Sequence, residues 1–415
     1  VCAWPATMTA DGEDVKNVPL VFIPGLFGSH LCRRNDTKGG GGGDRVYLNK
    51  RIAFGLRTPD LSMPITWEDN TDALSGKQQS PCPLIGTDED AGCLEYMTIL
   101  GFKVSGIYGP WLDKARAAGR KVIVFTWDWR RQVEEVSRDF ESFLERVVAE
   151  NGCSAQVVAH STGGLISLPL LNKRASALFH SVVFAGCPFG PGALPYEWLT
   201  YGTNIALNKK LLSPRVLFTH GLLWNFLSFG SDFDNDKSWR VMGSKDELKG
   251  KTLTGVYEEG GENPLPDFDP SKPEDWVKHS LALFEDGYTA SPEEIQHLSE
   301  SLRTARAFRE LMVSSSAQSK TQSDPVPIAV LRSSQRDTTQ YMYRKRSGSN
   351  DSWEWKRVES PTGDGTVHAI NAIPPPGVKH RVVEAPEQIH MTLMEADGFV
   401  DVVLNELHRE HLSYR

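Results

Sequence analysis

The chain has 415 residues, of which 40% are hydrophobic and 24% are charged, and its net charge is −8 at neutral pH. This is the composition of a globular protein with one large domain or two. Its acidic balance and scattered basic residues argue against a nucleic-acid partner bound by charge, and we find no apolar run long enough for a transmembrane segment.

The cysteines and the first residue leave the compartment open. The chain begins at Val1, so a removed signal peptide is compatible with the sequence, and sequons at Asn35 and Asn350 allow a secretory or lysosomal location. The separation of Cys82 and Cys93 allows a small disulfide ring. Cys153 and Cys187 lie beside predicted strands, and we expect them to be buried thiols.

The first part of the chain alternates short apolar runs with amphipathic repeats. This pattern predicts strands at 19–24 and 121–127 and helices at 111–118 and 133–150. Residues 32–95 are rich in Gly, Pro, Asp and Ser, and we interpret them as an irregular insertion that serves as a lid.

The alternation continues and is then interrupted once. An apolar run at 157–159, a helical pattern to about 174 and a strand at 181–185 predict a mostly parallel sheet with helices on both faces. Residues 193–325 have mostly helical and loop patterns, which favours a helical cap inserted into this α/β core. The core, 1–192 and 326–415, resumes with strands at 326–331 and 380–384, a hairpin near 348–350, and a closing helix at 393–409.

Ser161 has the setting of a catalytic nucleophile. It follows the apolar run Val157–Ala159 and precedes Gly163, Gly164 and a helical pattern, which is the strand–turn–helix layout of G-x-S-x-G motifs. Ala159 replaces the first glycine of that motif. An ordinary glycine turn is the alternative interpretation of these residues.

A reactive serine needs a base and an acid that orients the base, and the chain has candidates for both. Asp364 lies between two glycines and His390 follows the last predicted strand, so the order is Ser, Asp, His. A generic turn and a capping histidine are the alternatives. His368 follows Asp364 too closely and His380 begins a strand, so both are weaker candidates for the base.

Two further groups of residues fit the same chemistry. We expect the backbone N–H of Thr162 and that of Leu26, with Phe27 as second choice, to donate to a developing oxyanion. Aromatic side chains before and within the cap fit an acyl pocket or a lipid surface, or form the cap's own core: Phe27, Trp198, Trp224 and Phe226. For Asp128 and Arg130 we favour a structural ion pair.

Several of these segments together resemble the lecithin:cholesterol acyltransferase family, which includes phospholipid:diacylglycerol acyltransferases and lysosomal phospholipase A2. The similar segments are Ile23–Ser29, Asp128–Arg130, Ala159–Gly164, Gly186–Gly190, Gly363–Val367 and His390. The resemblance implies an α/β-hydrolase fold with a cap and a lid, and acyl transfer through an acyl-serine at Ser161, with Asp364 and His390 as its partners.

The predicted function is therefore that of a serine-dependent lipid acyl-ester hydrolase or O-acyltransferase without metal or cofactor. Its partner would be a lipid ester, in solution or at a membrane or lipoprotein surface. A non-catalytic lipid-binding or scaffold protein on the same fold is the alternative. The segments at 32–95 and 193–322 match no family member convincingly, so the choice between water and an alcohol as acceptor stays open.

Overall fold

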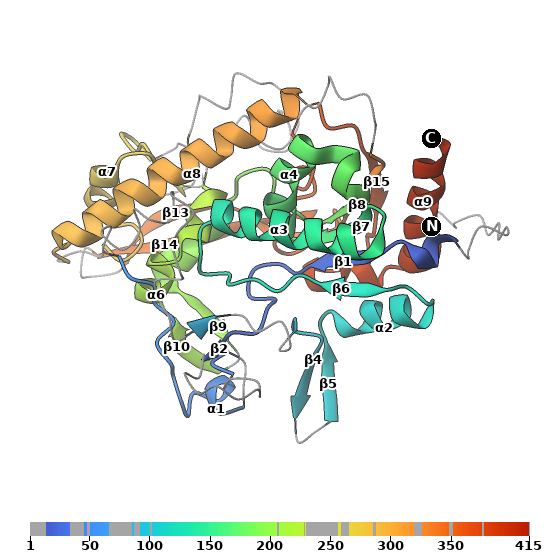
Figure 1. Ribbon diagram of the computed structural model, residues 1–415. Helices are drawn as coiled ribbons and strands as arrows, with labels where there is room; N and C mark the ends of the chain where they lie inside the picture. The colour runs from blue at the N-terminus through green and yellow to red at the C-terminus, as the bar shows by residue number, and fades with distance from the viewer. Residues whose placement is uncertain are drawn as a thin grey trace.

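Within the described residues, six parallel strands form the central sheet of the protein, as the computed structural model in Figure 1 shows. These strands are β1 (Leu20–Ile23), β6 (Val122–Val124), β7 (Ala155–His160), β8 (Phe179–Ala185), β12 (Ile328–Arg332) and β15 (Arg381–Glu384). The structure describes residues 14–33, 45–47, 50–65, 85–86, 92–99, 102–205, 207–227, 229, 256–258, 265–284, 288–318, 326–347, 352–375 and 377–414.

The order of the strands identifies the topology. It runs β15-β12-β8-β7-β1-β6, and each neighbouring pair is parallel. The chain begins in the sheet at β1, passes to β6 at one edge, and returns to β7 on the other side of β1. Loops that follow β1 and β7 therefore meet at the carboxyl end of the sheet, where α/β folds place their ligands.

Helices cover both faces of this sheet. Helices α3 (Val133–Asn151) and α4 (Gly163–Leu178) pack on one face, and α2 (Gly109–Ala117) and α9 (Leu404–Ser413) pack on the other. In β1, Val21 and Ile23 face the first layer while Leu20 and Phe22 face the second. The α/β-hydrolase fold predicted from the sequence is confirmed.

The segment between β8 and β12 forms the cap. It contains helices α5 (Leu194–Tyr201), α6 (Pro214–Phe218), α7 (Pro273–Lys278) and α8 (Pro292–Gln318), a 3₁₀ turn at Gly221–Phe226, and short strands β9 (Thr203–Ile205), β10 (Asn208–Leu212) and β11 (Val256–Tyr257). Aromatic side chains pack in its interior. The rings of Tyr196 and Trp276, for example, stack with centroids 5.4 Å apart. The buried apolar side chains of the cap are continuous with the hydrophobic core on one face of the central sheet.

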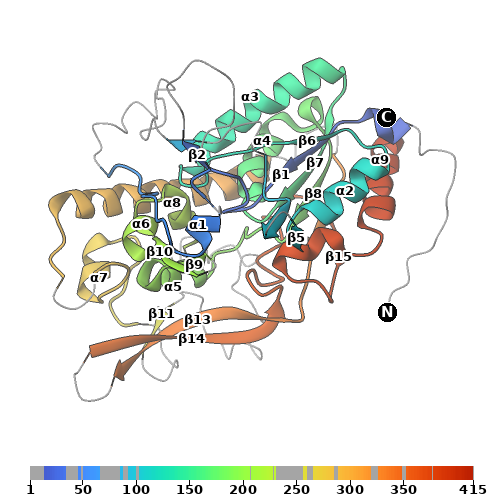
Figure 2. The same ribbon diagram turned by 90° about the horizontal axis from the view of Figure 1, so that it is seen from below.

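A long hairpin leaves the sheet after β12 and reaches the cap. Strands β13 (Arg336–Ser347) and β14 (Ser352–Gly363) are antiparallel, and β13 also pairs with β11 (Figure 2). The predicted turn at 348–350 lies outside the described residues. Tyr201 of α5 ties the hairpin to the cap, since its hydroxyl donates to the carbonyl of Trp355 over 2.7 Å. The end of β14 leads directly to Asp364.

The remaining elements are short. They are a 3₁₀ turn at Asp14–Asn17, β2 (Cys32–Arg33), α1 (Lys50–Ala53), β3 (Ile85–Gly86), β4 (Tyr96–Ile99), β5 (Phe102–Gly106), a 3₁₀ turn at His390–Glu395 and a π-helical turn at Phe399–Val403. Much of the predicted lid lies outside the described residues. None of the helices in the described part of the chain is long and apolar enough to cross a membrane.

Three sequence expectations need correction. The closing α-helix begins at Leu404 and continues directly from the π-helical turn at Phe399–Val403, while Gly398, with a positive φ of 75°, separates both from the 3₁₀ turn at His390–Glu395. Cys93 is a buried free thiol, and its proposed partner Cys82 lies outside the described residues. Cys153 is partly exposed, whereas Cys187 is buried as expected.

Candidate active site

Ser161 lies on a sharp turn between β7 and α4. Its φ is +52°, a left-handed backbone conformation that residues other than glycine rarely adopt and that stores strain. The turn is held because the N–H of Ser161 donates to the carbonyl of Ala185 over 2.8 Å. A strained serine between a strand and a helix is the geometry of a nucleophile elbow.

Small residues allow the chain to pass close to this turn. A Cβ on Gly163 would lie 2.8 Å from the carbonyl oxygen of Ile23, and a Cβ on Gly25 would lie 2.7 Å from Cβ of Ser161. Both contacts are too short for a side chain. Ala159, which replaces the first motif glycine, is buried and its carbonyl accepts a hydrogen bond from Sγ of Cys187. Its single methyl group is therefore accommodated in the core.

Asp364 and His390 form a buried pair. Oδ2 of Asp364 lies 2.7 Å from Nδ1 of His390, and Oδ1 accepts hydrogen bonds from the N–H groups of Thr366 and Val367. Burial by itself raises the pKa of Asp364, but the neighbouring imidazole and the N–H donors outweigh it and hold that pKa below its usual value. The carboxylate stays charged and fixes the proton of His390 on Nδ1, which leaves Nε2 able to accept a proton.

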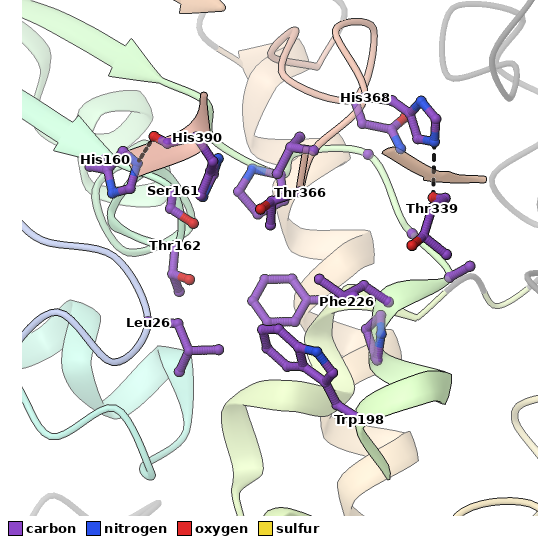
Figure 3. A pocket seen from close by; sticks show the side chains of 18 of the residues that line it. Leu26, His160, Ser161, Thr162, Trp198, Phe226, Thr339, Thr366, His368 and His390 are labelled. Carbon is purple, nitrogen blue, oxygen red and sulfur yellow. Dashed lines mark hydrogen bonds between the residues drawn. The ribbon is translucent and has the colours of Figure 1, made fainter. Parts of the chain in front are cut away.

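Ser161 and His390 share one cavity (Figure 3). Among the residues that the structure describes, no hydrogen bond joins the Ser161 hydroxyl to His390. Hydrogen bonds between a nucleophile and its base are commonly long without substrate and tighten when substrate binds.

A buried chain of hydrogen bonds connects His390 to the loop after β1. His160 Nε2 lies 2.8 Å from the carbonyl oxygen of His390, which only accepts, so Nε2 carries the proton. Burial and the nearby His390 lower the pKa of His160 to about 3, so its ring is neutral and Nδ1 accepts. The hydroxyl of Tyr108 donates to Nδ1 over 2.9 Å and accepts the N–H of Gly25 over 3.1 Å.

Aromatic side chains hold the oxyanion loop, by which we mean residues 24–29. The indole N–H of Trp127 donates to the carbonyl of Pro24, and that of Trp129 donates to the carbonyl of Ser29. Among the described residues, the N–H groups of Leu26, Phe27 and Thr162 donate no hydrogen bond within the chain. These groups are therefore free to donate to a ligand.

The cavity beside Ser161 has a volume of about 250 Å³ and two chemically different walls. One wall is apolar, and Figure 3 shows its side chains Leu26, Trp198 and Phe226. The cavity lining from the oxyanion loop and the cap also includes Phe27, Leu194 and Pro195. The other wall is polar, and Figure 3 shows its side chains Thr339, Thr366 and His368 from the hairpin and the loop after it. Asn371 of the same loop also lines the cavity. An apolar pocket with a few polar groups is typical of a site for a small amphipathic ligand.

Comparison with known proteins gives remote likenesses. No family model matches the chain, and no curated protein matches it. The chain is similar to a solved structure of the Tle4–Tli4 complex, at 12% identity over 96% of this chain and 99% of that chain, with a TM-score of 0.48. It is also similar to the mature Bacillus licheniformis lipase BlEst2, at 10% identity over 94% and 92% of the two chains, with a TM-score of 0.36.

A third similar structure is phospholipase PlaB from Legionella pneumophila in complex with thio-NAD. The identity is 9% over 95% of this chain and 63% of that chain, with a TM-score of 0.23. Because all three TM-scores are below 0.5, the fold rests on the strand order and the helical layers of this chain, and the site rests on its own geometry.

Not every residue expected at the site lies there. Phe27, Trp198 and Phe226 line the cavity, but Trp224 does not. Trp224 is fully buried in the cap, with its ring 5.5 Å from that of Trp276. Trp224 therefore belongs to the core of the cap, which was the alternative interpretation of these aromatic residues.

The two rival histidines differ in position. His368 lines the cavity, but its Nε2 lies 3.0 Å from the carbonyl of Thr339 and its Nδ1 lies 2.7 Å from the hydroxyl of Thr362. Both ring nitrogens are thus engaged within the hairpin. His380 lies at the start of β15, bonded to the carbonyl of Val378, and does not line the cavity.

Asp128 and Arg130 form the expected ion pair. Both are buried, and the guanidinium binds the carboxylate with two hydrogen bonds of 2.9 and 2.6 Å. Between them Trp129 packs edge-on against Phe27, with ring centroids 4.9 Å apart. The pair therefore fixes the segment after β6 that places Trp129 against Phe27 of the apolar wall.

Sequence reasoning missed Tyr108 and His160. His160 precedes the serine and was visible as part of the motif, but its role depends on a contact with His390, 230 residues away in the chain. Tyr108 is 52 residues from His160, and no local pattern marks it.

Proposed function

We propose that the protein is a serine-dependent lipid acyl-ester hydrolase or O-acyltransferase that works through an acyl-serine intermediate. The observation that carries the proposal is Ser161, strained on its turn and facing the same cavity as a His390 whose Nδ1 is held by a buried carboxylate. The order Ser161, Asp364, His390 along the chain is that of α/β-hydrolases.

In the first half-reaction, Oγ of Ser161 attacks the ester carbonyl while Nε2 of His390 takes the hydroxyl proton. The carbonyl π electrons move to the oxygen, and the N–H groups of Thr162 and Leu26, with Phe27 as the alternative donor, stabilise the oxyanion. When the oxyanion collapses, the bond to the alcohol oxygen breaks and His390 gives its proton to the leaving alcohol.

In the second half-reaction, an acceptor hydroxyl attacks the acyl-serine and gives its proton to His390. The bond between the acyl carbon and Oγ then breaks, and the proton returns to Oγ. Water as acceptor gives a carboxylic acid, and an alcohol as acceptor gives a new ester. Asp364 keeps its charge throughout and stabilises the imidazolium.

The two walls of the cavity support a lipid ester as substrate. The apolar wall with Trp198 and Phe226 suits the acyl chain, because its burial removes apolar surface from water. The polar wall with Thr339 and Thr366 suits the alcohol part of the ester. The sequence resemblance to the lecithin:cholesterol acyltransferase family supports the same substrate class.

Active-site labelling tests the proposal. A fluorophosphonate probe is expected to label the wild-type protein, and Ser161→Ala is expected to lose labelling and at least about 1,000-fold in turnover of a p-nitrophenyl ester. Ser167→Ala, on the same helix, is the control, because the Ser167 hydroxyl bonds to the Gly163 carbonyl within α4. Full turnover by Ser161→Ala would refute the proposal, and tight lipid binding without labelling would favour a non-catalytic lipid-binding protein.

Product analysis distinguishes hydrolysis from transfer. With a phospholipid donor alone we expect free fatty acid, because water is then the acceptor present. If a long-chain alcohol is added and its fatty-acid ester is formed, the protein transfers the acyl group to the alcohol. A fatty-acid yield that does not change with the alcohol, without new ester, would leave hydrolysis as the activity.

A further inference from the structure

Two surface turns expose large apolar side chains that the proposed reaction does not use. Phe54 and Leu56, which follow α1, are 55% and 78% exposed, and Leu207, in the turn between β9 and β10, is 70% exposed. An exposed leucine alone is ordinary, but a group of large apolar side chains on one projection marks an interaction site.

The three side chains belong to one projection, although they are about 150 residues apart in the chain. The N–H of Leu207 donates to the carbonyl of Ala53 over 3.0 Å, which joins the two turns directly. Figures 1 and 2 both show α1 beside the β9–β10 hairpin. We call Phe54, Leu56 and Leu207 the apolar tip.

A buried asparagine fixes the shape of the apolar tip. The amide of Asn208 donates to the carbonyl of Ile52 over 2.9 Å and to that of Arg57 over 3.3 Å, while its oxygen accepts the N–H groups of Lys210 and Leu211. Asn208 is 2% exposed. The apolar side chains are thus displayed on a hydrogen-bonded scaffold before any partner binds, which lowers the entropic cost of binding.

The turn that carries Phe54 and Leu56 is also closed on itself. The N–H groups of Leu56 and Arg57 donate to the carbonyl of Arg51, and the N–H of Gly55 donates to that of Ile52. Ile52 itself is fully buried. The turn therefore anchors one apolar side chain in the core and directs the next two into solvent.

Basic side chains surround the apolar tip. Arg51, Arg57, Lys209 and Lys210 are exposed on the same two turns. Asp60 is the sole acidic residue of segments 50–65 and 201–213, whereas the whole chain has a net charge of −8. A local excess of positive charge around apolar side chains complements an anionic lipid surface, which attracts the cations and admits the apolar groups.

The tip is connected to the wall of the candidate active site. Helix α5, which carries Trp198 of the apolar wall, leads through Gly202 into the β9–β10 hairpin. Tyr47 and Ile52 belong to the same hydrophobic core. The ring centroid of Tyr47 lies 6.3 Å from that of Phe27 in the apolar wall. Docking of the tip would hold the cavity near the lipid that supplies its substrate.

We propose that Phe54, Leu56 and Leu207 insert into the surface of an anionic lipid bilayer while the surrounding lysines and arginines contact its headgroups. The value of this docking for substrate supply rests on the proposed function, but the docking itself is measurable without catalysis.

Vesicle sedimentation with the full-length Ser161→Ala protein tests the docking. We expect binding to phosphatidylcholine vesicles that contain phosphatidylglycerol, and a loss of at least about tenfold in affinity for the added triple change Phe54→Ser, Leu56→Ser and Leu207→Ser. Leu412→Ser is the matched control, because Leu412 is 45% exposed on α9, away from the tip. Absence of vesicle binding, or equal binding by the triple variant, would overturn the proposal.

The charge of the vesicles gives an independent measurement. Lys209→Gln with Lys210→Gln is expected to weaken binding to phosphatidylglycerol-containing vesicles about fivefold and to leave binding to pure phosphatidylcholine unchanged. Equal losses on both vesicles would contradict the role of the basic side chains. The same triple change is also made in the chain that keeps Ser161. If it abolishes vesicle binding but the probe still labels Ser161, the role of the apolar tip in membrane docking is confirmed. Intact binding without labelling of wild type would reject only the proposed enzymatic function.

Discussion

At the scale of single residues, the Tyr108–His160 chain links the proposed base to the proposed oxyanion hole. Tyr108→Phe removes the group that accepts the N–H of Gly25 and donates to His160. Each buried group left without a partner costs about 1–3 kcal/mol. Because Gly25 precedes the donor Leu26, we expect kcat for a soluble ester to fall about 10–100-fold with little change in KM.

Two substitutions of His160 distinguish its hydrogen bond to His390 from its hydrogen bond to Tyr108. A glutamine amide reaches the position of Nε2 and can donate to the carbonyl of His390, whereas an asparagine amide reaches only the position of Nδ1, beside Tyr108. We expect His160→Gln to retain more kcat than His160→Asn, with similar melting temperatures. Equal and wild-type kcat values for both variants would show that His160 does not position the base.

At the same scale, the sequence identified candidate site residues but not the contacts that support them. Ser161, Asp364 and His390 were recognisable because short local patterns surround each of them, and the structure brings them to one end of the sheet. Tyr108 and the role of His160 were not recognised, because a buried hydroxyl or imidazole is identified by its hydrogen-bond partner. Those partners lie on distant segments, and a single sequence does not reveal such pairs.

At the scale of elements, two tryptophans of the cap have different surroundings, one on helix α5 and one in the 3₁₀ turn at Gly221–Phe226. Trp198 faces the cavity and Trp224 faces the cap core. Trp198→Ala should enlarge the apolar wall and raise kcat/KM for bulky or branched acyl esters relative to butyrate by about tenfold, since pocket contacts of this size contribute about 1–3 kcal/mol to discrimination. Turnover of a series of p-nitrophenyl esters measures this ratio.

Trp224→Ala is the control variant, to be assayed on the same series of p-nitrophenyl esters. It leaves a cavity in a packed core, so it should lower the free energy of unfolding by about 3–5 kcal/mol without shifting the acyl preference. If Trp198→Ala destabilises the protein equally and leaves the preference unchanged, Trp198 is also a core residue and the acyl pocket lies elsewhere.

The elements of the core were predictable and those of the cap were less so. The strands and helices around β7 follow clear apolar repeats, so their positions were predicted within a few residues. Strand β6 is shorter than expected because the chain turns away after Phe125 to place Trp127 and Trp129 against the oxyanion loop. The length of β13 and β14 was not foreseen, since their partners α5 and β11 come from the cap.

At the scale of the whole molecule, buried neutral histidines make the fold sensitive to acid. Burial lowers the pKa of His30, His220 and His297 to about 4, and that of His160 to about 3, from an ordinary value of 6.5. These residues lie in the core and in the cap, so both parts of the structure are affected.

The direction of the effect follows from proton binding. Between pH 6.5 and 4.5 the unfolded chain binds protons at these four imidazoles that the folded chain does not, so the free energy of unfolding falls as the pH falls. Each histidine contributes up to about 1.4 kcal/mol per pH unit. Glu134 acts in the opposite direction, because burial raises its pKa to about 7 and the folded chain then binds the extra proton. Burial also lowers the pKa of His279 and His368 and raises that of Glu197 and Glu395, so six imidazoles against three carboxyl groups leave a net loss of stability.

We therefore expect the melting temperature to fall steadily from pH 7.5 to pH 5.0, before the loss of charge on Asp364, whose pKa is held below its usual value, contributes. His220→Gln tests the cause, because the amide can still donate to the carbonyl of Leu61 but does not titrate. This variant should have a shallower dependence of melting temperature on pH than the wild type. A wild-type melting temperature that rises on acidification would mean that Glu134 and other carboxyl groups dominate, and that the imidazoles do not stay neutral in the folded protein.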